Sequence, residues 1–207
     1  MTPRAGFAYA QARLQARYGG RPDDVLWRTL EASRTAAHAL ALTRGGPLAA
    51  WTDGLAEATD PHRIEPHLRV RWRQQVETIA SWLPLRWQPA ARWFAALVEL
   101  PLADAPAAAE RAAQWRGEWR RRLPADAGDA ARLAEPAALL MPRLTDATAM
   151  RAAGAEPTRR ALERLLRRQA GTAVAVFASL ALLALELERL RGILVVRAMF
   201  DRAAQAA

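Results

Sequence analysis

Apolar side chains recur every three or four positions along most of the chain, the spacing that places them on one face of an α-helix. The clearest stripe lies in 66–83, and its members are Leu68, Trp72, Val76, Ile79 and Leu83. Similar stripes follow in 107–123 and from Thr158 onward, and no stretch shows the alternation typical of a half-buried strand. The pattern therefore predicts an all-α fold, a multi-helix bundle with a long C-terminal core helix.

Thirteen prolines divide these stripes and predict where helices begin and end. Pro22 is predicted to open a helix, and Pro66 to occupy a first helical position rather than an interior one. After Pro84, a second apolar helix is expected over roughly 89–100.

The distribution of tryptophan suggests how the chain is organised. All eight tryptophans fall between Trp27 and Trp119, and none follows. We predict a Trp-rich helical bundle over 1–123 and an Ala/Pro-rich linker or short helices over 124–156. A C-terminal helical hairpin, or one long helix that packs on the first bundle, is predicted over 157–207.

The longest apolar stretch lies near the carboxyl end, where the seventeen residues from Gln169 to Leu185 contain no ionisable group. A helix of that length spans about 25 Å, slightly less than the roughly 30 Å hydrocarbon core of a membrane. Several members are alanine, and Gly171 and Thr172 make membrane insertion less favourable still. Apolar residues resume over 193–200 and are expected to be core residues as well. We favour a helix buried in protein, with a membrane-embedded helix as the alternative.

Charge is unevenly distributed along the chain. The net charge is +9, and because lysine is absent all thirty basic groups are arginine. Residues 1–20 carry +3 and 157–207 carry +5, so only +1 falls between them. Such ends suit an acidic protein surface, anionic lipid headgroups or nucleic acid. The first twenty residues lack the apolar run of a secretory signal, so a cytoplasmic location is expected.

Three segments resemble one protein family. The opening FAYAQARLQARYG, the segment IEPHLRVRWRQQVETIASWLPLRWQPAARWFAALVELPLA and the closing ELERLRGILVVRAMF are similar to the C subunit of V/A-type ATPases, called subunit d in eukaryotic vacuolar ATPases. Glu186, Glu188, Leu190, Arg191 and Ile193 stand on the matching positions of the family's helical ending. Together the segments cover about half of the chain. Their motifs are of moderate specificity, because helices rich in Ala, Leu and Arg resemble one another easily.

The resemblance implies a wholly helical, non-catalytic subunit. In the family this subunit sits on the cytoplasmic mouth of the membrane rotor ring and receives the foot of the central stalk. It therefore implies protein partners and a peripheral position on the cytoplasmic face of the inner membrane. The chain departs from the family in being shorter, as if a middle bundle were missing, and in reading Glu99-Leu100-Pro101-Leu102 after the apolar helix. A shortened relative that binds another helical partner is the second interpretation.

One group of side chains is typical of metal ligands, namely His62, Glu65 and His67. The two histidines lie five positions apart rather than four, and Pro66 interrupts the helix face, so exposed residues before a helix start are the favoured interpretation. His38 lies on an Ala-rich segment and is expected to be partly buried.

The sequence holds little other chemistry typical of an enzyme. The chain has no cysteine, and its glycine pairs lack the Lys and Ser/Thr of a phosphate-binding loop. We therefore expect no enzymatic activity and no catalytic, cofactor-binding or metal-binding residue, and the sequence does not identify the residues that bind a partner.

Glu186 and Glu188 interrupt the apolar C-terminal helix, and two roles are open for them. They form ion pairs with Arg189, Arg191 or an arginine of another helix, or they reach a surface where a partner docks. An isolated buried charge would destabilise the fold, so ion pairing is the favoured role.

Nucleic acid is the alternative partner for the positive charge. The run Arg120, Arg121 and Arg122 lies beside Trp115 and Trp119 and suits phosphate contacts with aromatic support. Both tryptophans belong to an apolar stripe, however, and residues 103–156 carry eight arginines and eight acidic residues. Nucleic acid is therefore the less favoured partner, and contact with a membrane surface stays open.

Overall fold

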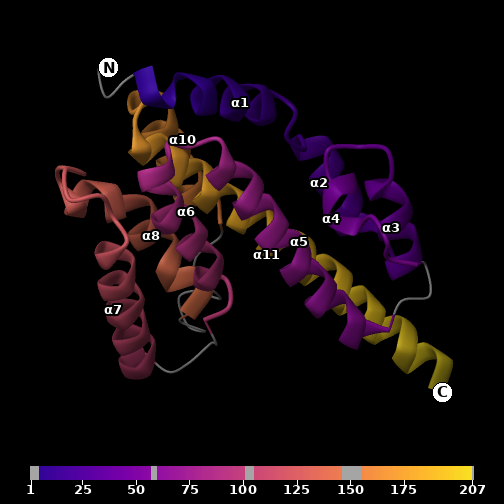
Figure 1. Ribbon diagram of the computed structural model, residues 1–207. Coiled ribbons are helices and arrows are strands. Elements are labelled where there is room, and N and C mark those ends of the chain that lie inside the picture. Colours follow the sequence, from indigo (N-terminus) through magenta and orange to yellow (C-terminus); the bar gives the residue numbers. More distant parts are fainter. Residues whose placement is uncertain (1–4, 57–59, 101–104, 146–154, 207) are drawn as a thin grey trace. The chain divides into compact units, whose positions relative to one another are not determined.

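The computed structural model of the chain describes residues 5–56, 60–100, 105–145 and 155–206. Within these ranges all regular structure is helical and no strand is present, which confirms the predicted all-α class (Figure 1). The elements in chain order, with η for a 3-10 helix, are η1 (Ala5–Phe7), α1 (Ala8–Gly19), α2 (Asp24–Ala32), α3 (Ala36–Thr43), α4 (Ala49–Thr52), α5 (Pro61–Ser81), η2 (Leu85–Trp87), α6 (Gln88–Trp93), η3 (Phe94–Leu97), α7 (Ala105–Arg121), α8 (Ala130–Thr145), α10 (Glu156–Arg168) and α11 (Ala173–Ala206).

The described residues form two compact units, each assembled from separate parts of the chain. Unit 1 comprises the described parts of Met1–Gln15 and Gln75–Leu185. Unit 2 comprises the described parts of Ala16–Gln74 and Glu186–Ala207. The division into 1–123, 124–156 and 157–207 that the sequence suggests stays a prediction.

Unit 1 is organised around the ring of Phe177, which lies on α11. This ring packs edge-on against Trp119 of α7, with 5.1 Å between the ring centroids. It also stacks on Phe94 of η3 at 5.8 Å and lies 6.5 Å from Trp87 of η2. All four side chains are buried, so elements that are far apart in sequence share one aromatic core.

The first part of α11 is enclosed by protein. Every residue from Ala173 to Leu187 is buried, which confirms the favoured interpretation of the apolar stretch. A helix that is apolar on all sides requires such enclosure. Separately, none of the helices in the described ranges is long and apolar enough to cross a lipid bilayer.

The helix α8 occupies much of the region for which a linker or short helices were expected. It is 16 residues long, and its buried side chains include Leu133, Leu140 and Leu144. These positions lie seven and four residues apart, so they share one face. α8 contacts both α7 and α10, which makes it part of the core of unit 1.

The short helices α2 and α3 of unit 2 have defined N-caps. Asp23 before α2 and Thr35 before α3 each accept a hydrogen bond from the backbone N–H three residues later, at 2.7 and 3.2 Å. The buried aromatic side chains of this unit are Trp27, Trp51 and Trp72.

Proline does not mark every helix boundary in this chain. The prediction that Pro66 begins a helix is wrong, because α5 begins at Pro61 and contains Pro66 in its interior. Pro136 and Pro142 likewise lie inside α8. An interior proline removes one backbone hydrogen bond, and the buried stripes on either side of these prolines offset that loss.

Two further boundaries differ from the sequence prediction. α2 begins at Asp24 rather than Pro22, because the side chain of Asp23 caps it. The single helix expected over 89–100 is instead α6 followed by the 3-10 helix η3. Phe94 and Leu97 are nevertheless fully buried, so this segment still contributes to the core as predicted.

Candidate functional site

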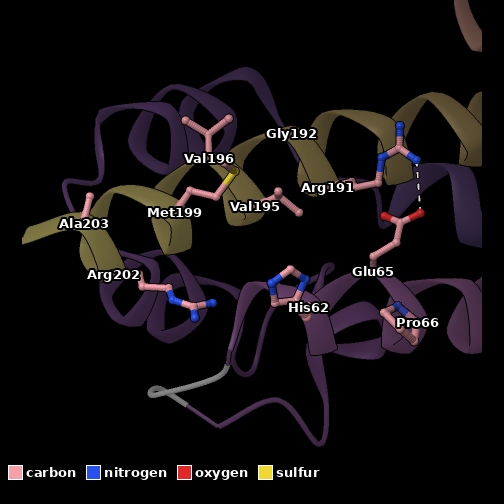
Figure 2. A pocket seen from close by; sticks show the side chains of 10 residues that line it. All are labelled: His62, Glu65, Pro66, Arg191, Gly192, Val195, Val196, Met199, Arg202 and Ala203. Atoms are coloured by element: carbon pink, nitrogen blue, oxygen red, sulfur yellow. Dashed lines mark hydrogen bonds and ion pairs between the residues drawn. The ribbon is translucent and has the colours of Figure 1, made fainter. Parts of the chain in front are cut away.

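An open groove of about 860 Å³ lies in unit 2 between α5 and the C-terminal half of α11, and it is here called the α5–α11 groove. Figure 2 shows the side chains that line it, with Val195 and Arg202 pointing from α11 toward the helix that carries His62. The lining residues are His62, Glu65 and Pro66 of α5 and Arg191, Gly192, Val195, Val196, Met199, Arg202 and Ala203 of α11.

Large apolar side chains are exposed at and beside the groove. Val196 is 45% exposed, Met199 61% and Phe200 65%. The expectation that the apolar residues of 193–200 form core is correct for Leu194, which is buried, but wrong for these three, and Ile193 and Val195 are partly exposed. The reason is that α11 carries apolar residues around more of its circumference here than the unit can cover.

The opposite face of this part of α11 is fixed to α2 and α3. Arg189 donates a hydrogen bond to the Glu31 carboxylate at 2.8 Å, and Arg197 donates one to the Glu31 carbonyl at 2.8 Å. Further along, Asp201 accepts a hydrogen bond at 2.7 Å from the backbone N–H of Ala36, the first residue of α3. These three residues recur every four or eight positions, so the groove residues are left on the other face.

Charged side chains close one end of the groove and flank the other. Arg191 donates to Glu65 across the groove at 3.3 Å, drawn as a dashed line in Figure 2, and Arg69 donates to the same carboxylate at 2.8 Å. Glu65 therefore has two guanidinium partners, and that of Arg191 is shared with Glu188. Arg202 is 65% exposed and lies 3.9 Å from Asp60, a loose pair that leaves its guanidinium accessible.

The ion-pair role predicted for Glu186 and Glu188 is confirmed. Glu186 is only 6% exposed and forms an ion pair with Arg21, and Glu188 pairs with Arg191 at 2.8 Å. Burial raises the pKa of Glu186, and the nearby Arg21 and Arg17 guanidinium groups partly offset that rise. Burial in turn lowers the pKa of Arg17. These glutamates are therefore structural parts of unit 2.

The histidines do not form a metal site in the part of the chain that the structure describes. His62 and Glu65 line the groove, whereas His67 lies elsewhere on α5, and no group of three potential ligands is present among the described residues. The expectation that these residues precede a helix is wrong, because all three lie within α5. Burial lowers the pKa of His67, and Arg71 lowers it further. His38 is exposed rather than partly buried, since it lies on the outer face of α3.

The arginine run beside the tryptophans offers no aromatic platform for nucleic-acid bases. Trp115 and Trp119 are buried and stack on each other with 6.0 Å between centroids, which confirms that they are core residues. Arg121 and Arg122 both form ion pairs with Glu118. Base stacking requires exposed rings, so these tryptophans could not provide it in this fold.

A smaller cavity of about 310 Å³ lies in unit 1 between η2 and the N-terminus of α11. Three of its four charged lining side chains, those of Arg86, Asp126 and Asp129, form hydrogen bonds. Arg86 donates to Asp126 at 2.5 Å, and Asp129 accepts hydrogen bonds from the first backbone N–H groups of α8 at 2.9 and 3.2 Å. The lining therefore carries mixed and matched charge.

No protein-family model, no curated protein and no solved structure matches the chain. The geometry of the α5–α11 groove is therefore the main structural basis for a functional assignment.

Proposed function

We propose that the chain is a non-catalytic helical adaptor that joins one component of an assembly to another by protein–protein contacts. The observation that carries this proposal is the α5–α11 groove, where Val196 and Met199 are 45% and 61% exposed between charged side chains. Exposed apolar groups clustered in a groove with a polar rim are typical of protein-binding sites.

The assembly that we propose is a V/A-type rotary ATPase, in which the adaptor couples the central stalk to the membrane rotor ring. The support comes from the sequence resemblance and from where its segments lie. Most of the residues in both walls of the groove lie in segments that carry the resemblance, namely the one that starts at Ile64 and the closing segment 186–200, whereas His62, Arg202 and Ala203 lie outside them. The subunit would then lie in the cytoplasm, peripherally on the inner membrane.

The experiment is purification of the tagged, full-length chain from the membranes of cells that produce it, followed by mass spectrometry of the proteins that come with it. Rotary ATPase stalk and ring subunits in defined ratio to the chain are the expected result. Recovery of the chain as a free monomer, without such subunits, would overturn the rotary assignment. The same tag on an unrelated cytoplasmic protein controls for adventitious membrane proteins.

A further inference from the structure

We infer that the α5–α11 groove binds an amphipathic α-helix of another protein, and that the apolar stripe of that helix is flanked by Asp and Glu. The inference rests on the proposed adaptor function and specifies the chemistry of its partner. The occupant is defined by the length, the apolar surface and the charge of the groove.

The length of the groove fits a short helix. Its α11 wall extends from Arg191 to Ala203, which corresponds to about 18 Å at 1.5 Å per residue. An occupant of about 12–14 residues, or three to four turns, would cover that wall. Along it Arg191, Val195 and Met199 recur every four residues, so they form one row that a helix can follow.

The apolar surface gives the occupant a reason to bind. Met199 is 61% exposed and Val196 is 45% exposed, and both line the groove. Covering such side chains removes apolar area from water, which favours association roughly in proportion to the area buried. Leu, Ile or Phe at i, i+3 or i+4 and i+7 of a partner helix would place an apolar row against these residues.

The charge of the groove walls selects an acidic partner. The stretches 60–74 and 189–206 carry eight arginines and three acidic residues, or +5, whereas unit 2 as a whole carries 13 arginines and 10 acidic residues, or +3. The positive charge of the unit is therefore concentrated on the segments that form the groove. At the groove itself, Glu65 pairs with Arg69 and with Arg191, which also pairs with Glu188, and Arg202 is loosely paired with Asp60 and exposed. Complementary charge on a partner would steer it to this surface.

A second copy of the chain fits this surface less well. A symmetric contact would place the groove of one copy against the groove of the other. The arginines Arg191 and Arg202 of the two copies would then face one another, and like charges oppose that arrangement. An anionic membrane fits less well too, because the groove is concave and has the carboxylate of Glu65 in its wall.

The test starts from a display library of random 16-residue peptides selected against the full-length chain. We expect the enriched peptides to be net negative and to share apolar residues at helical spacing. The tightest peptide, synthesised with a fluorophore, would then be titrated by fluorescence anisotropy, and its Kd should rise with ionic strength. Enriched peptides without acidic residues or without the helical stripe, or a selection that enriches nothing, would overturn the inference.

Two pairs of variants locate the binding surface. Met199→Glu should weaken peptide binding at least 10-fold, and Val25→Glu should leave it unchanged, because Val25 on α2 is also 61% exposed and does not line the groove. Arg202→Glu should weaken binding about 5- to 10-fold, and Arg34→Glu, which changes an exposed arginine between α2 and α3, should not. All four changes are at exposed positions, and circular dichroism checks the fold. Equal effects within a pair would contradict the inference.

Three further outcomes count against the inference. If the chain sediments with phosphatidylglycerol vesicles and Met199→Glu abolishes this sedimentation, the groove binds lipid. A dimer in analytical ultracentrifugation that the same variant dissolves would assign it to a second copy. The third outcome combines two results: rotary ATPase subunits still purify with the Met199→Glu and Arg202→Glu variants, and the selection yields no acidic peptides. It would keep the proposed rotary function and reject the groove as the binding site. If the selection yields acidic helical peptides but the chain is recovered alone from membranes, the groove inference is supported and the proposed rotary function is rejected.

Discussion

Arg21 forms an ion pair with Glu186, although the two residues lie 165 positions apart. Arg21 lies in the turn after α1, and Glu186 lies on α11 where the fully enclosed stretch of that helix ends. A second guanidinium, that of Arg17, is close enough to act on the same carboxylate. The pair holds a charged group inside unit 2 that burial alone would exclude.

The stability of the fold should depend on pH through Glu186. Burial raises the pKa of its carboxyl above the ordinary value of 4.5, so between 4.5 and the raised value the folded state binds more protons than the unfolded state. The contribution of Glu186 is thus fully present below pH 4.5 and is lost as the pH rises through the folded-state pKa. We expect the melting temperature of the wild type, relative to that of Glu186→Gln, to fall as pH rises above about 4.5. A difference that does not change with pH, measured by circular dichroism, would contradict this.

Removing the partner of Glu186 should be costly at neutral pH. Arg21→Met keeps most of the apolar stem but leaves the carboxyl without its closest cation, which for buried pairs costs about 3 kcal/mol. The loss should shrink at pH 4.5, where the carboxyl takes up a proton more readily. Urea unfolding at both pH values measures this effect. Arg28→Met, at an exposed position on α2, should change the free energy of unfolding by less than about 0.5 kcal/mol.

The aromatic core of unit 1 should depend on Phe177. Phe177→Ala removes a ring that contacts Trp87, Phe94 and Trp119, and such truncations typically cost about 3–5 kcal/mol. Phe200→Ala removes an identical side chain from the same helix, where it is 65% exposed, and should cost less than about 1 kcal/mol. Tryptophan fluorescence during urea unfolding measures both. Similar costs would show that Phe177 is not central.

An interior proline of α8 should be replaceable with a gain in stability. Pro142 is exposed, so Pro142→Ala restores a backbone hydrogen bond without removing a buried side chain. After allowance for the greater freedom of the unfolded chain, we expect a gain of about 1 kcal/mol in urea unfolding. Pro157→Ala is the matched control, because Pro157 stands in the first turn of α10, where proline is well tolerated. A gain at Pro157 but not at Pro142 would contradict the expectation.

The helices that could be predicted are those whose burial is periodic. Leu68, Trp72 and Ile79 are each at most 1% exposed, as their spacing on one stripe indicates. Proline was less informative, because the preference of a proline such as Pro66 for a first turn is local, and the packing of a long apolar stripe can override it.

The pairing of Glu186 with Arg21 could not be predicted from the sequence. Periodicity indicates which face of a helix is buried, but it does not say which distant residue meets that face. With thirty arginines in the chain, the sequence indicated that an arginine would pair with Glu186 without identifying it.

The groove could be recognised in part from one local signal. Val195 and Val196, and then Met199 and Phe200, are adjacent apolar pairs, and neighbours on a helix point about 100° apart. One buried face therefore could not accommodate both members of each pair. Such an excess predicts exposed apolar surface, although it does not say which helix forms the opposite wall.

The position of α11 in the order of synthesis has a consequence for how the chain acquires its structure. Phe177 completes the core of unit 1, and Glu186 and Leu194 are buried in unit 2, yet all three lie on the helix that leaves the ribosome after every other described helix. Until then, both units expose apolar side chains that α11 later covers. Such nascent surfaces are prone to aggregate, so the chain should rely on chaperones during translation more than a protein whose N-terminal half closes early.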